Sequence, residues 1–450
     1  MQKDFSVLIK GKNPAFNKIV SGKKFPDKSI THRAYIIASQ CLGVSKIKGL
    51  ISDDIKSTIT ALKKLGIKIT SKKDFSSVYG SGISGFKKFS GSLDFGNSGT
   101  SARSFLGLLA CHPYQIKITG DSSLKLRPFK RVTNYLEKIG AIIKHPKNKN
   151  ISLPIKVYGT KEWALAQKHV VKIKSAQITS ALIYAALQIK GETEIIESSE
   201  TRDHTQLLLQ SLKADILVKK NKGRRITRIR GQKEMRNFSI DVPADPSSSC
   251  FFVIQTLLSK RSSLLIKNVC INNTRIGFIK ILKKMGGKIK ILNKKKYFGE
   301  KVADLYVKSS KLKGINCPVN LIVKSVDDLP AIWVACSLAS GVSYFKGISE
   351  LRLKESDRIK SMSESLRKLG IKNYTTKDSI KIIGNPNIKT LKNIKIPSNH
   401  DHRIAMANFL MGSLTGSRIL ITGFQTVSSS FPNFLELQKI LGAKYEIKKN

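Results

Sequence analysis

The sequence predicts an α/β protein of two domains, each built from three copies of one supersecondary unit. Six segments with helical periodicity each end at a Gly or Ala residue, and a short stretch rich in β-branched residues follows each one. The Gly or Ala is called the closing position below. The closing positions, 66, 140, 214, 286, 370 and 442, lie 74, 74, 72, 84 and 72 residues apart. Such a regular period indicates a repeated unit. A chain of 450 residues also exceeds the size at which one core keeps growing, so three repeats per domain fit the length.

The first helix of interest in each repeat is the one that ends at a closing position. Glycine is expected just after a helix because it enters the left-handed region without strain. Five of the six closing residues are glycine, and the third repeat has Ala214. The six closing segments are residues 61–66, 135–140, 209–214, 282–286, 366–370 and 438–442.

Each repeat also contains a second, more apolar helix with a polar start. Apolar residues on all sides of such a helix predict that it is buried. None of them reaches 18 uninterrupted apolar residues, so no membrane span is expected. These helices are expected to begin near Thr31, Gly99, Ser175, Pro246, Asp327 and Asp401.

The starts of the apolar helices are unusually polar. Unpaired N–H groups and a partial positive charge make helix N-termini suitable for phosphate and carboxylate. Capping is an alternative role, and it accounts for the serines and aspartates. It does not account for Arg33, Arg103 and Arg403, because a buried guanidinium costs desolvation unless it is paired. If the repeats are symmetric, these starts converge and favour a multiply anionic ligand. The polar residues are Lys28, Ser29, Arg33, Asn97, Gly99, Thr100, Arg103, Ser175, Gln177, Asp245, Ser247, Ser248, Asp327, Asp401, His402 and Arg403.

A second cationic feature lies at residues 351–359. Lys354 and Arg358 are four apart and are expected to share one helix face, whereas Glu355 and Asp357 should point elsewhere. Two cations one turn apart repel each other, so an external anion between them is the first interpretation. A solvated helix start with local ion pairs is the alternative.

The formal charge of +51 raises the question of nucleic-acid binding. The 81 basic residues are 17 Arg and 64 Lys, and the lysines are scattered over all predicted surfaces. No aromatic-interleaved basic strip, zinc-finger spacing or helix-turn-helix pattern accompanies them. We therefore expect no specific nucleic-acid partner, while weak nonspecific RNA binding at low salt stays open.

The cysteines and the N-terminal residues indicate a reducing compartment. Residues 1–10 lack an apolar signal segment, so we expect a cytoplasmic location.

His400 and His402 are two positions apart at a helix start, so their side chains should diverge. No third metal ligand is evident near them, and no metal is expected. The six cysteines lie mostly in apolar runs without paired spacing and are expected to be reduced core residues: Cys41, Cys111, Cys250, Cys270, Cys317 and Cys336.

Nine motifs, in order from about Lys28 to Pro432, resemble the 5-enolpyruvylshikimate-3-phosphate (EPSP) synthase family. Each motif alone is weak, but nine in register are specific. The first five are Asp27-Lys28-Ser29-Ile30-Thr31-His32-Arg33, Gly96-Asn97-Ser98-Gly99-Thr100-Ser101-Ala102-Arg103, Leu126-Arg127-Pro128, Ser175-Ala176-Gln177 and Arg202-Asp203-His204-Thr205. The other four are Asp245-Pro246-Ser247-Ser248, Lys354-Glu355-Ser356-Asp357-Arg358, Asp401-His402-Arg403-Ile404-Ala405-Met406 and Ser430-Phe431-Pro432.

The resemblance implies the two-domain enolpyruvyl-transferase fold. Each domain would hold three βαβαββ units around a pseudo-threefold axis, as an inside-out α/β barrel. The first domain would comprise residues 1–24 and 244–450, the second residues 25–243, with the active site in the cleft between them. The implied reaction transfers the enolpyruvyl group of phosphoenolpyruvate to the 5-hydroxyl of shikimate 3-phosphate and releases phosphate. The resemblance implies no metal or organic cofactor, and a monomer.

The resemblance also implies roles for individual residues. Asp327 and Glu355 would be the base and the acid, with Lys28 able to move a proton or stabilise charge. A carboxyl can act as an acid only if it is protonated part of the time. Shikimate 3-phosphate would be held by Lys28, Ser29, Arg33, Ser175, Ala176 through its backbone, Gln177, Arg202, Asp327 and Lys354. Phosphoenolpyruvate would be held by Lys28, Gly99, Arg127, Gln177, Arg358 and Arg403.

The chain departs from the family pattern at several positions. Ala176 stands where many members have a second serine, Glu350 where some have Asn, and Ser429 where some have Lys. For glyphosate, which competes with phosphoenolpyruvate in sensitive members, Gly99 fits the sensitive pattern but Ser104 replaces its usual proline. We expect competitive inhibition that is weaker than in typical sensitive members.

The related UDP-N-acetylglucosamine enolpyruvyl transferases are the nearest alternative among enzymes. They usually have Lys-Asn at the first helix and a reactive Cys, or Asp, on a mobile loop. Here Ser29 follows Lys28, and residues 124–128 contain neither. A basic RNA-binding protein on an enzyme-like scaffold is the alternative from another class, and its activity should be lost at high salt.

Overall fold

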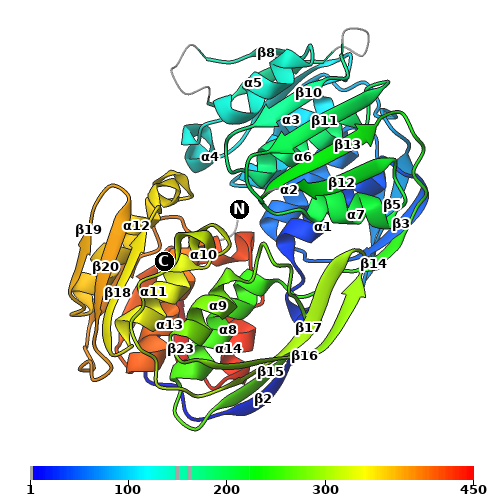
Figure 1. The fold of residues 1–450 in the computed structure, drawn as a ribbon. Helices are drawn as coiled ribbons and strands as arrows, with labels where there is room; N and C mark the ends of the chain where they lie inside the picture. Colours follow the sequence, from blue (N-terminus) through cyan, green and yellow to red (C-terminus); the bar gives the residue numbers. More distant parts are fainter. Residues whose placement is uncertain (1–3, 147–151, 160–163, 222, 450) are drawn as a thin grey trace. The chain divides into compact units, whose positions relative to one another are not determined.

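A computed structural model describes residues 4–146, 152–159, 164–221 and 223–449 of the chain. It contains two compact units (Figure 1). Unit 1 comprises Met1–Pro26, Pro243–Lys295 and Lys301–Asn450, whose terminal residues 1–3 and 450 lie outside the described part. Unit 2 comprises Asp27–Val242 and Lys296–Glu300. The short segment Lys296–Glu300 was expected in the other domain.

Within its described residues, unit 2 contains three four-stranded sheets with one pairing pattern. In each sheet the first two strands are parallel and the following pairs are antiparallel. The first sheet has the order β14 (Ser239–Asp241), β3 (Leu42–Lys48), β5 (Ser76–Ser81), β4 (Lys68–Ser71). The second has the order β6 (Gly91–Asp94), β7 (Gln115–Thr119), β9 (Ile155–Tyr158), β8 (Ile142–Lys144). The third has the order β10 (Lys168–Val171), β11 (Glu192–Glu197), β13 (Arg224–Arg230), β12 (Ile216–Asn221).

Unit 1 repeats this four-strand order in two sheets, and a third sheet lacks the first strand. One sheet is β2 (Asn17–Ser21), β15 (Ser263–Cys270), β17 (Glu300–Lys308), β16 (Lys288–Tyr297), and β2 and β15 are parallel. Another is β21 (Ile394–Pro397), β22 (Ile419–Thr422), β1 (Phe5–Ile9), β23 (Tyr445–Lys449). The remaining sheet has three strands, β18 (Gly341–Lys346), β20 (Ser379–Gly384) and β19 (Asn373–Thr375). Two isolated parallel bridges, Lys313 to Ser340 and Asn316 to Tyr344, take the place of its fourth strand.

Three buried helices fill each unit, and the sheets lie outside them (Figure 1). Phe251 and Phe252 show why: they occupy neighbouring positions about 100° apart on one helix, yet both are 0% exposed. These are the second, apolar helices that the sequence predicted. In unit 2 they are α1 (Lys28–Ser39), α3 (Gly99–Leu109) and α6 (Ala176–Ala186). In unit 1 they are α8 (Pro246–Leu258), α11 (Leu329–Ser337) and α13 (His402–Thr415), which contact one another.

A second set of six amphipathic helices ends at the predicted closing positions. Glycines 66, 140, 286, 370 and 442 have φ between +78° and +101°, which confirms the left-handed helix ends. In the third repeat the positive φ, +56°, falls on Lys213, the residue after the C-cap Leu212 and one residue before the predicted closing position Ala214. The six helices are α2 (Asp53–Lys64), α5 (Lys130–Lys138), α7 (His204–Ser211), α9 (Gly277–Lys284), α12 (Arg358–Lys368) and α14 (Phe434–Ile440).

Short helices connect these elements. They are α4 (Ser122–Leu126), α10 (Val319–Val323), and the 3₁₀ turns η1 (Gly22–Lys24), η2 (Ser349–Leu353) and η3 (Phe424–Ser429). All six cysteines are buried, as predicted, and none forms a disulfide within the described residues. Burial raises the pKa of the Cys41, Cys317 and Cys336 thiols to about 12. Across the described ranges, no helix combines the length and hydropathy needed to cross a membrane.

Candidate active site

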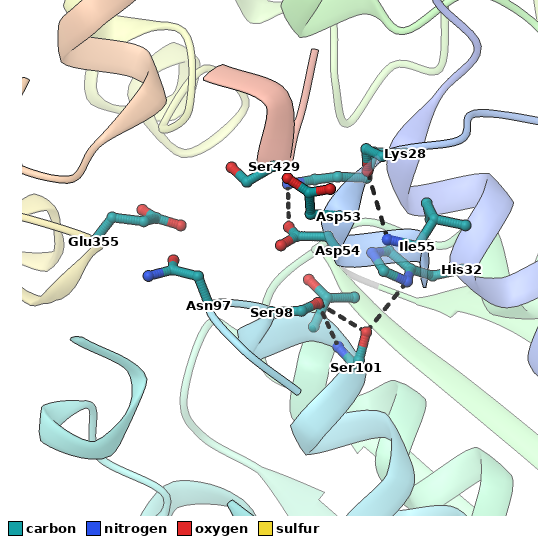
Figure 2. A network of polar contacts seen from close by, with 12 residues as sticks. Lys28, His32, Asp53, Asp54, Ile55, Asn97, Ser98, Ser101, Glu355 and Ser429 are labelled. Atoms are coloured by element: carbon teal, nitrogen blue, oxygen red, sulfur yellow. Dashed lines mark hydrogen bonds and ion pairs between the residues drawn. The ribbon is translucent and has the colours of Figure 1, made fainter. Parts of the chain in front are cut away.

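Lys28 is the first residue of α1, and it forms an ion pair with Asp54 (Figure 2). The N-cap Asp27 accepts a hydrogen bond from the Ile30 amide at 2.8 Å, which starts the helix at Lys28. Lys28 Nζ lies 2.7 Å from Asp54 Oδ2, and both side chains are largely buried. Sequence analysis did not select Asp54. It is the second residue of α2, and its only signal was its place after the N-cap Ser52.

His32 lies one turn further along α1 and joins three helices of unit 2. Its Nδ1 is 2.8 Å from Thr58 Oγ1 on α2 and 3.3 Å from Ser101 Oγ on α3 (Figure 2). Burial, and then the charges of Lys28 and Arg33, hold the pKa of His32 well below its ordinary value. A neutral imidazole therefore fixes the start of α1 against the start of α3.

Arg33 points its guanidinium toward three neutral acceptors of unit 2. It is 4% exposed and donates to Thr205 Oγ1 at 2.8 Å, to the Ser29 carbonyl at 2.9 Å and to Ser180 Oγ at 3.0 Å. The three contacts hold the first turn of α1, with Ser29, against α6 and α7. These contacts fix the guanidinium of Arg33 near the start of α1.

Gly99 begins α3 between two arginines. Arg103 donates to Gln177 Oε1 at 3.1 Å, and Arg127 donates to Asn97 Oδ1 at 2.5 Å. A Cβ atom at Gly99 would lie 2.7 Å from Arg103 Nη1 and 3.2 Å from Arg127 Nη1. Three predicted residues, Gly99, Arg127 and Gln177, are therefore brought together. Arg103 was noted only as a buried cation and was left out of the predicted ligands.

Ser175 occupies the N-cap position of α6 without a capping hydrogen bond from its side chain. Ser175 makes no side-chain capping hydrogen bond, whereas Asp27, Ser98, Asp245 and Asp401 cap their helices. Capping therefore explains four of the six central helix starts. Ser175 is a partly exposed hydroxyl in front of the Ala176 and Gln177 backbone, and Arg202 lies in the loop before α7.

In unit 1, Arg358 is the first residue of α12 and is surrounded by carboxylates. Its Nε lies 2.8 Å from Asp401 Oδ2, its Nη2 2.6 Å from Glu355 Oε2 and its Nη1 3.4 Å from Asp327 Oδ1. Burial lowers the pKa of Arg358, but the charges of these carboxylates outweigh burial and raise it. The two predicted acid/base residues, Asp327 and Glu355, are thus both held on one guanidinium.

The expectation that Lys354 and Arg358 share a helix face is wrong. Asp357 is the N-cap of α12, so Lys354 precedes the helix and only follows the η2 turn. Lys354 Nζ nevertheless approaches Asp327 Oδ1 at 3.9 Å. Glu355 does not point elsewhere either, because the chain before the N-cap turns its carboxylate onto Arg358. The alternative of local ion pairs therefore describes this segment better than two unpaired cations do.

Arg403 and Asp328 are two further buried ionisable residues of unit 1. Nε and Nη1 of Arg403 are buried and have no hydrogen-bond partner within the residues that the structure describes. Asp328, the N-cap of α11, is 2% exposed, and burial raises its pKa to about 6 against the opposing charges of Arg403 and Arg275. Sequence analysis selected its neighbour Asp327 and missed Asp328, which the same Asp-Asp pair could have suggested.

Two departures from the family pattern, Glu350 and Ser429, lie in 3₁₀ turns. The hydroxyl of Ser429 donates to the Thr426 carbonyl at 2.7 Å within η3. Glu350 is in the first turn of η2. The Ser429 hydroxyl therefore serves the local turn in this structure.

Two three-part units with buried cations at the starts of some of their central helices have the fold of the enolpyruvyl transferases. The enolpyruvyl transferase NikO from Streptomyces tendae has this fold, with a TM-score of 0.77, complete coverage of both chains and 12% identity. An EPSP synthase structure from Acinetobacter baumannii matches with a TM-score of 0.85 and 32% identity over 99% of this chain and 100% of that one.

The sequence comparisons narrow this class to one family. The sequence model of EPSP synthase (3-phosphoshikimate 1-carboxyvinyltransferase) matches residues 18–437. The 3-phosphoshikimate 1-carboxyvinyltransferase of Ruthia magnifica subsp. Calyptogena magnifica is 41% identical over 92% of this chain and 94% of its own length. That of Petrotoga mobilis is also 41% identical, over 91% of this chain and 94% of its own. The chain belongs to the EPSP synthase family.

Proposed function

We propose that this protein transfers the enolpyruvyl group of phosphoenolpyruvate to the 5-hydroxyl of shikimate 3-phosphate and releases phosphate. The product would feed chorismate and aromatic amino-acid biosynthesis in the cytoplasm, with the protein acting as a monomer. Family membership over residues 18–437 carries this proposal. The buried cations at the central helix starts agree with it, because both substrates carry phosphate and carboxylate groups.

Shikimate 3-phosphate would be bound mainly by the helix starts of unit 2. Ser175 supports this assignment, since its hydroxyl is not used as a cap and stands at the positive end of α6. Many relatives have a second serine hydroxyl at the position of Ala176. Here only the backbone N–H of Ala176 would be available to the substrate. The full set is Lys28, Ser29, Arg33, Ser175, Ala176, Gln177 and Arg202 of unit 2, together with Asp327 and Lys354 of unit 1.

Phosphoenolpyruvate would be bound where Gly99 leaves room between two arginines. The arrangement of Arg103 and Arg127 around this glycine supports an oxyanion site, because arginine forks suit carboxylate and phosphate. Arg403 supports the unit 1 side, because a buried guanidinium with two nitrogens lacking partners in the described chain is costly until an anion arrives. The full set is Lys28, Gly99, Arg127, Gln177, Arg358 and Arg403.

Asp327 and Glu355 would carry out the proton transfers. One carboxylate takes the proton of the attacking 5-hydroxyl while the carbon–oxygen bond forms, and the other delivers a proton to the methylene carbon of the enol. Elimination then returns a proton from the new methyl group, restores the double bond and expels phosphate. Arg358 contacts both carboxylates, which supports their joint action. Lys28, paired with Asp54, would stabilise the charge that develops on the substrates.

A phosphate-release assay tests the proposal directly. The purified protein is incubated with phosphoenolpyruvate and shikimate 3-phosphate, together and singly. We expect phosphate only with both substrates present. Replacement of the acceptor by UDP-N-acetylglucosamine is the control, and turnover with that acceptor instead would reject the proposed substrate.

A further inference from the structure

The hairpin formed by β16 and β17 belongs to both units. Its strands lie in a sheet of unit 1, but its tip, Lys296–Glu300, groups with unit 2. The tip fits its surroundings closely: the Tyr297 hydroxyl accepts a hydrogen bond from the Asp241 amide at 2.9 Å. The ring of Phe298 lies 6.0 Å from that of Phe238. Gly299 has φ +73°, and a Cβ atom there would lie 2.7 Å from the Leu207 carbonyl of α7.

Glu300 ends this tip and meets the first residue of α7. His204 Nδ1 lies 2.5 Å from Glu300 Oε1, and the two residues are 1% and 3% exposed. The carboxylate accepts, so Nδ1 carries the proton. Asp203, the N-cap of α7, makes no side-chain capping bond. Glu300 thus supplies a negative group at the positive end of this helix, where such a charge is favourable.

Arg225 and Arg33 also hold the residues around the start of α7. Arg225, which is 0% exposed, donates to the Thr201 carbonyl at 3.0 Å and contacts Asp203 Oδ2 at 3.3 Å. Thr205 accepts a hydrogen bond from Arg33 at 2.8 Å. Residues 201, 203, 204 and 205 are therefore all fixed through side chains or backbone, and Arg202 lies between them.

We propose that Glu300 is a positioning residue for shikimate 3-phosphate. Through His204 it sets the start of α7, and with it the backbone of Arg202 and the Thr205 contact to Arg33. Glu300 is buried in this contact and acts through His204. The inference rests on the proposed function, because Arg202 and Arg33 are assigned to shikimate 3-phosphate there. It adds a residue from the β16–β17 hairpin, which no motif of the sequence pointed to.

Steady-state kinetics of Glu300→Ala and Glu300→Gln test the inference. For Glu300→Ala we expect KM for shikimate 3-phosphate to rise about tenfold, as for loss of one charge-assisted hydrogen bond. The kcat and the KM for phosphoenolpyruvate should change less than about twofold, within the usual effect of a distant substitution. Glu300→Gln keeps an acceptor for His204 Nδ1–H and should restore most of the affinity. Lys301→Ala, an exposed neighbour on the same strand, is the matched control and should behave as wild type.

A double-mutant cycle with Arg202→Ala locates the effect. If Glu300 acts through the Arg202 segment, the two substitutions together should raise KM by much less than the product of their separate effects. The inference would be overturned if KM rose equally for both substrates or did not change. It would also be overturned if the rise in KM of the double variant equalled the product of the two separate rises. If Glu300→Ala does not fold, Glu300→Asp shortens the carboxylate by one methylene and carries the same test. Absence of turnover in the wild type would instead reject the proposed function.

Discussion

Arg358 and Asp401 form an ion pair that joins the start of α12 to the N-cap of α13, with Nε 2.8 Å from Oδ2. Both residues are almost fully buried. Asp401 also accepts the Arg403 amide at 2.8 Å, so one carboxylate caps a central helix and neutralises an arginine of the preceding surface helix. The backbone of Arg403 and the guanidinium of Arg358 are therefore positioned by the same side chain.

Asp401→Asn should destabilise unit 1 strongly. The amide can still accept the helix-capping bond, but it leaves Arg358 without its most deeply buried counter-charge. Removal of one partner from a buried pair costs about 3–5 kcal/mol, and we expect the lower end because Glu355 and Asp327 remain. Urea unfolding measures the change. Asp357→Asn, at the partly exposed cap of α12, is the control and should cost about 1 kcal/mol or less.

Asp327→Ala and Glu355→Ala should each lower kcat by at least about a hundredfold, the usual effect of removing a positioned acid or base. Circular dichroism should show an intact fold, since both side chains are partly exposed and Arg358 keeps Asp401. Phosphate release is the measurement. Near-native turnover in both variants would exclude their roles in proton transfer.

Arg127→Ala should raise the KM for phosphoenolpyruvate about 10- to 100-fold and leave that for shikimate 3-phosphate almost unchanged. The expected loss is one charge-assisted contact, about 1.5–3 kcal/mol. Arg127→Lys should recover only part of the affinity, because an ammonium lacks the two-pronged geometry. Lys125→Ala, exposed on α4, is the control. An equal rise in KM for both substrates would instead mean that Arg127 stabilises its loop and does not bind phosphoenolpyruvate.

Gly99→Ala should weaken inhibition by glyphosate more than it weakens phosphoenolpyruvate binding. The added Cβ would meet Arg103 Nη1 at 2.7 Å, so the guanidinium must move, and the longer ligand tolerates a displaced arginine less well. Inhibition constants against phosphoenolpyruvate measure the effect. If the inhibitor constant of the variant is unchanged, Gly99 does not line the phosphoenolpyruvate pocket.

Ionisation of Asp328 should make stability depend on pH. Burial raises its folded-state pKa to about 6, above the ordinary 3.8, so the folded protein binds this proton more tightly than the unfolded chain. The unfolding free energy should therefore rise as pH falls from above 6 toward 4, by an amount on the order of 3 kcal/mol for a shift of about two units.

Asp328→Asn isolates this contribution. His32 and His169, whose folded-state pKa values are lowered by burial, oppose it below pH 6.5 but are common to both proteins. The difference in unfolding free energy between wild type and Asp328→Asn should change between pH 8 and pH 5. A constant difference across this range would mean that the pKa of Asp328 is not raised in the folded protein.

The repeats could be predicted from the sequence because their signals are local. A glycine at a helix end, such as Gly66 or Gly442, has its conformational role wherever the helix packs. The partners of Arg358 were not predictable in this way, since Asp401 is 43 residues away and only the packing of α12 against α13 brings it near. The error at Lys354 has a local cause: Asp357 was read as part of the helix, although an aspartate there is a strong N-cap. Asp54 and Asp328 were missed because a carboxylate at a helix start is ordinary until its partner is known.

The position of β1 constrains the order in which the protein can be completed during synthesis. This strand lies between β22 and β23, pairing Val7 with Ile421 and Phe5 with Lys449. The ribosome makes β1 well before its two neighbours β22 and β23, whereas Asp27–Val242 is continuous and can assemble in between. A nascent chain must therefore carry an apolar, unpaired strand while about four hundred further residues are added, a condition that favours aggregation. We expect release of this protein from the ribosome to depend on chaperones that shield its first strand.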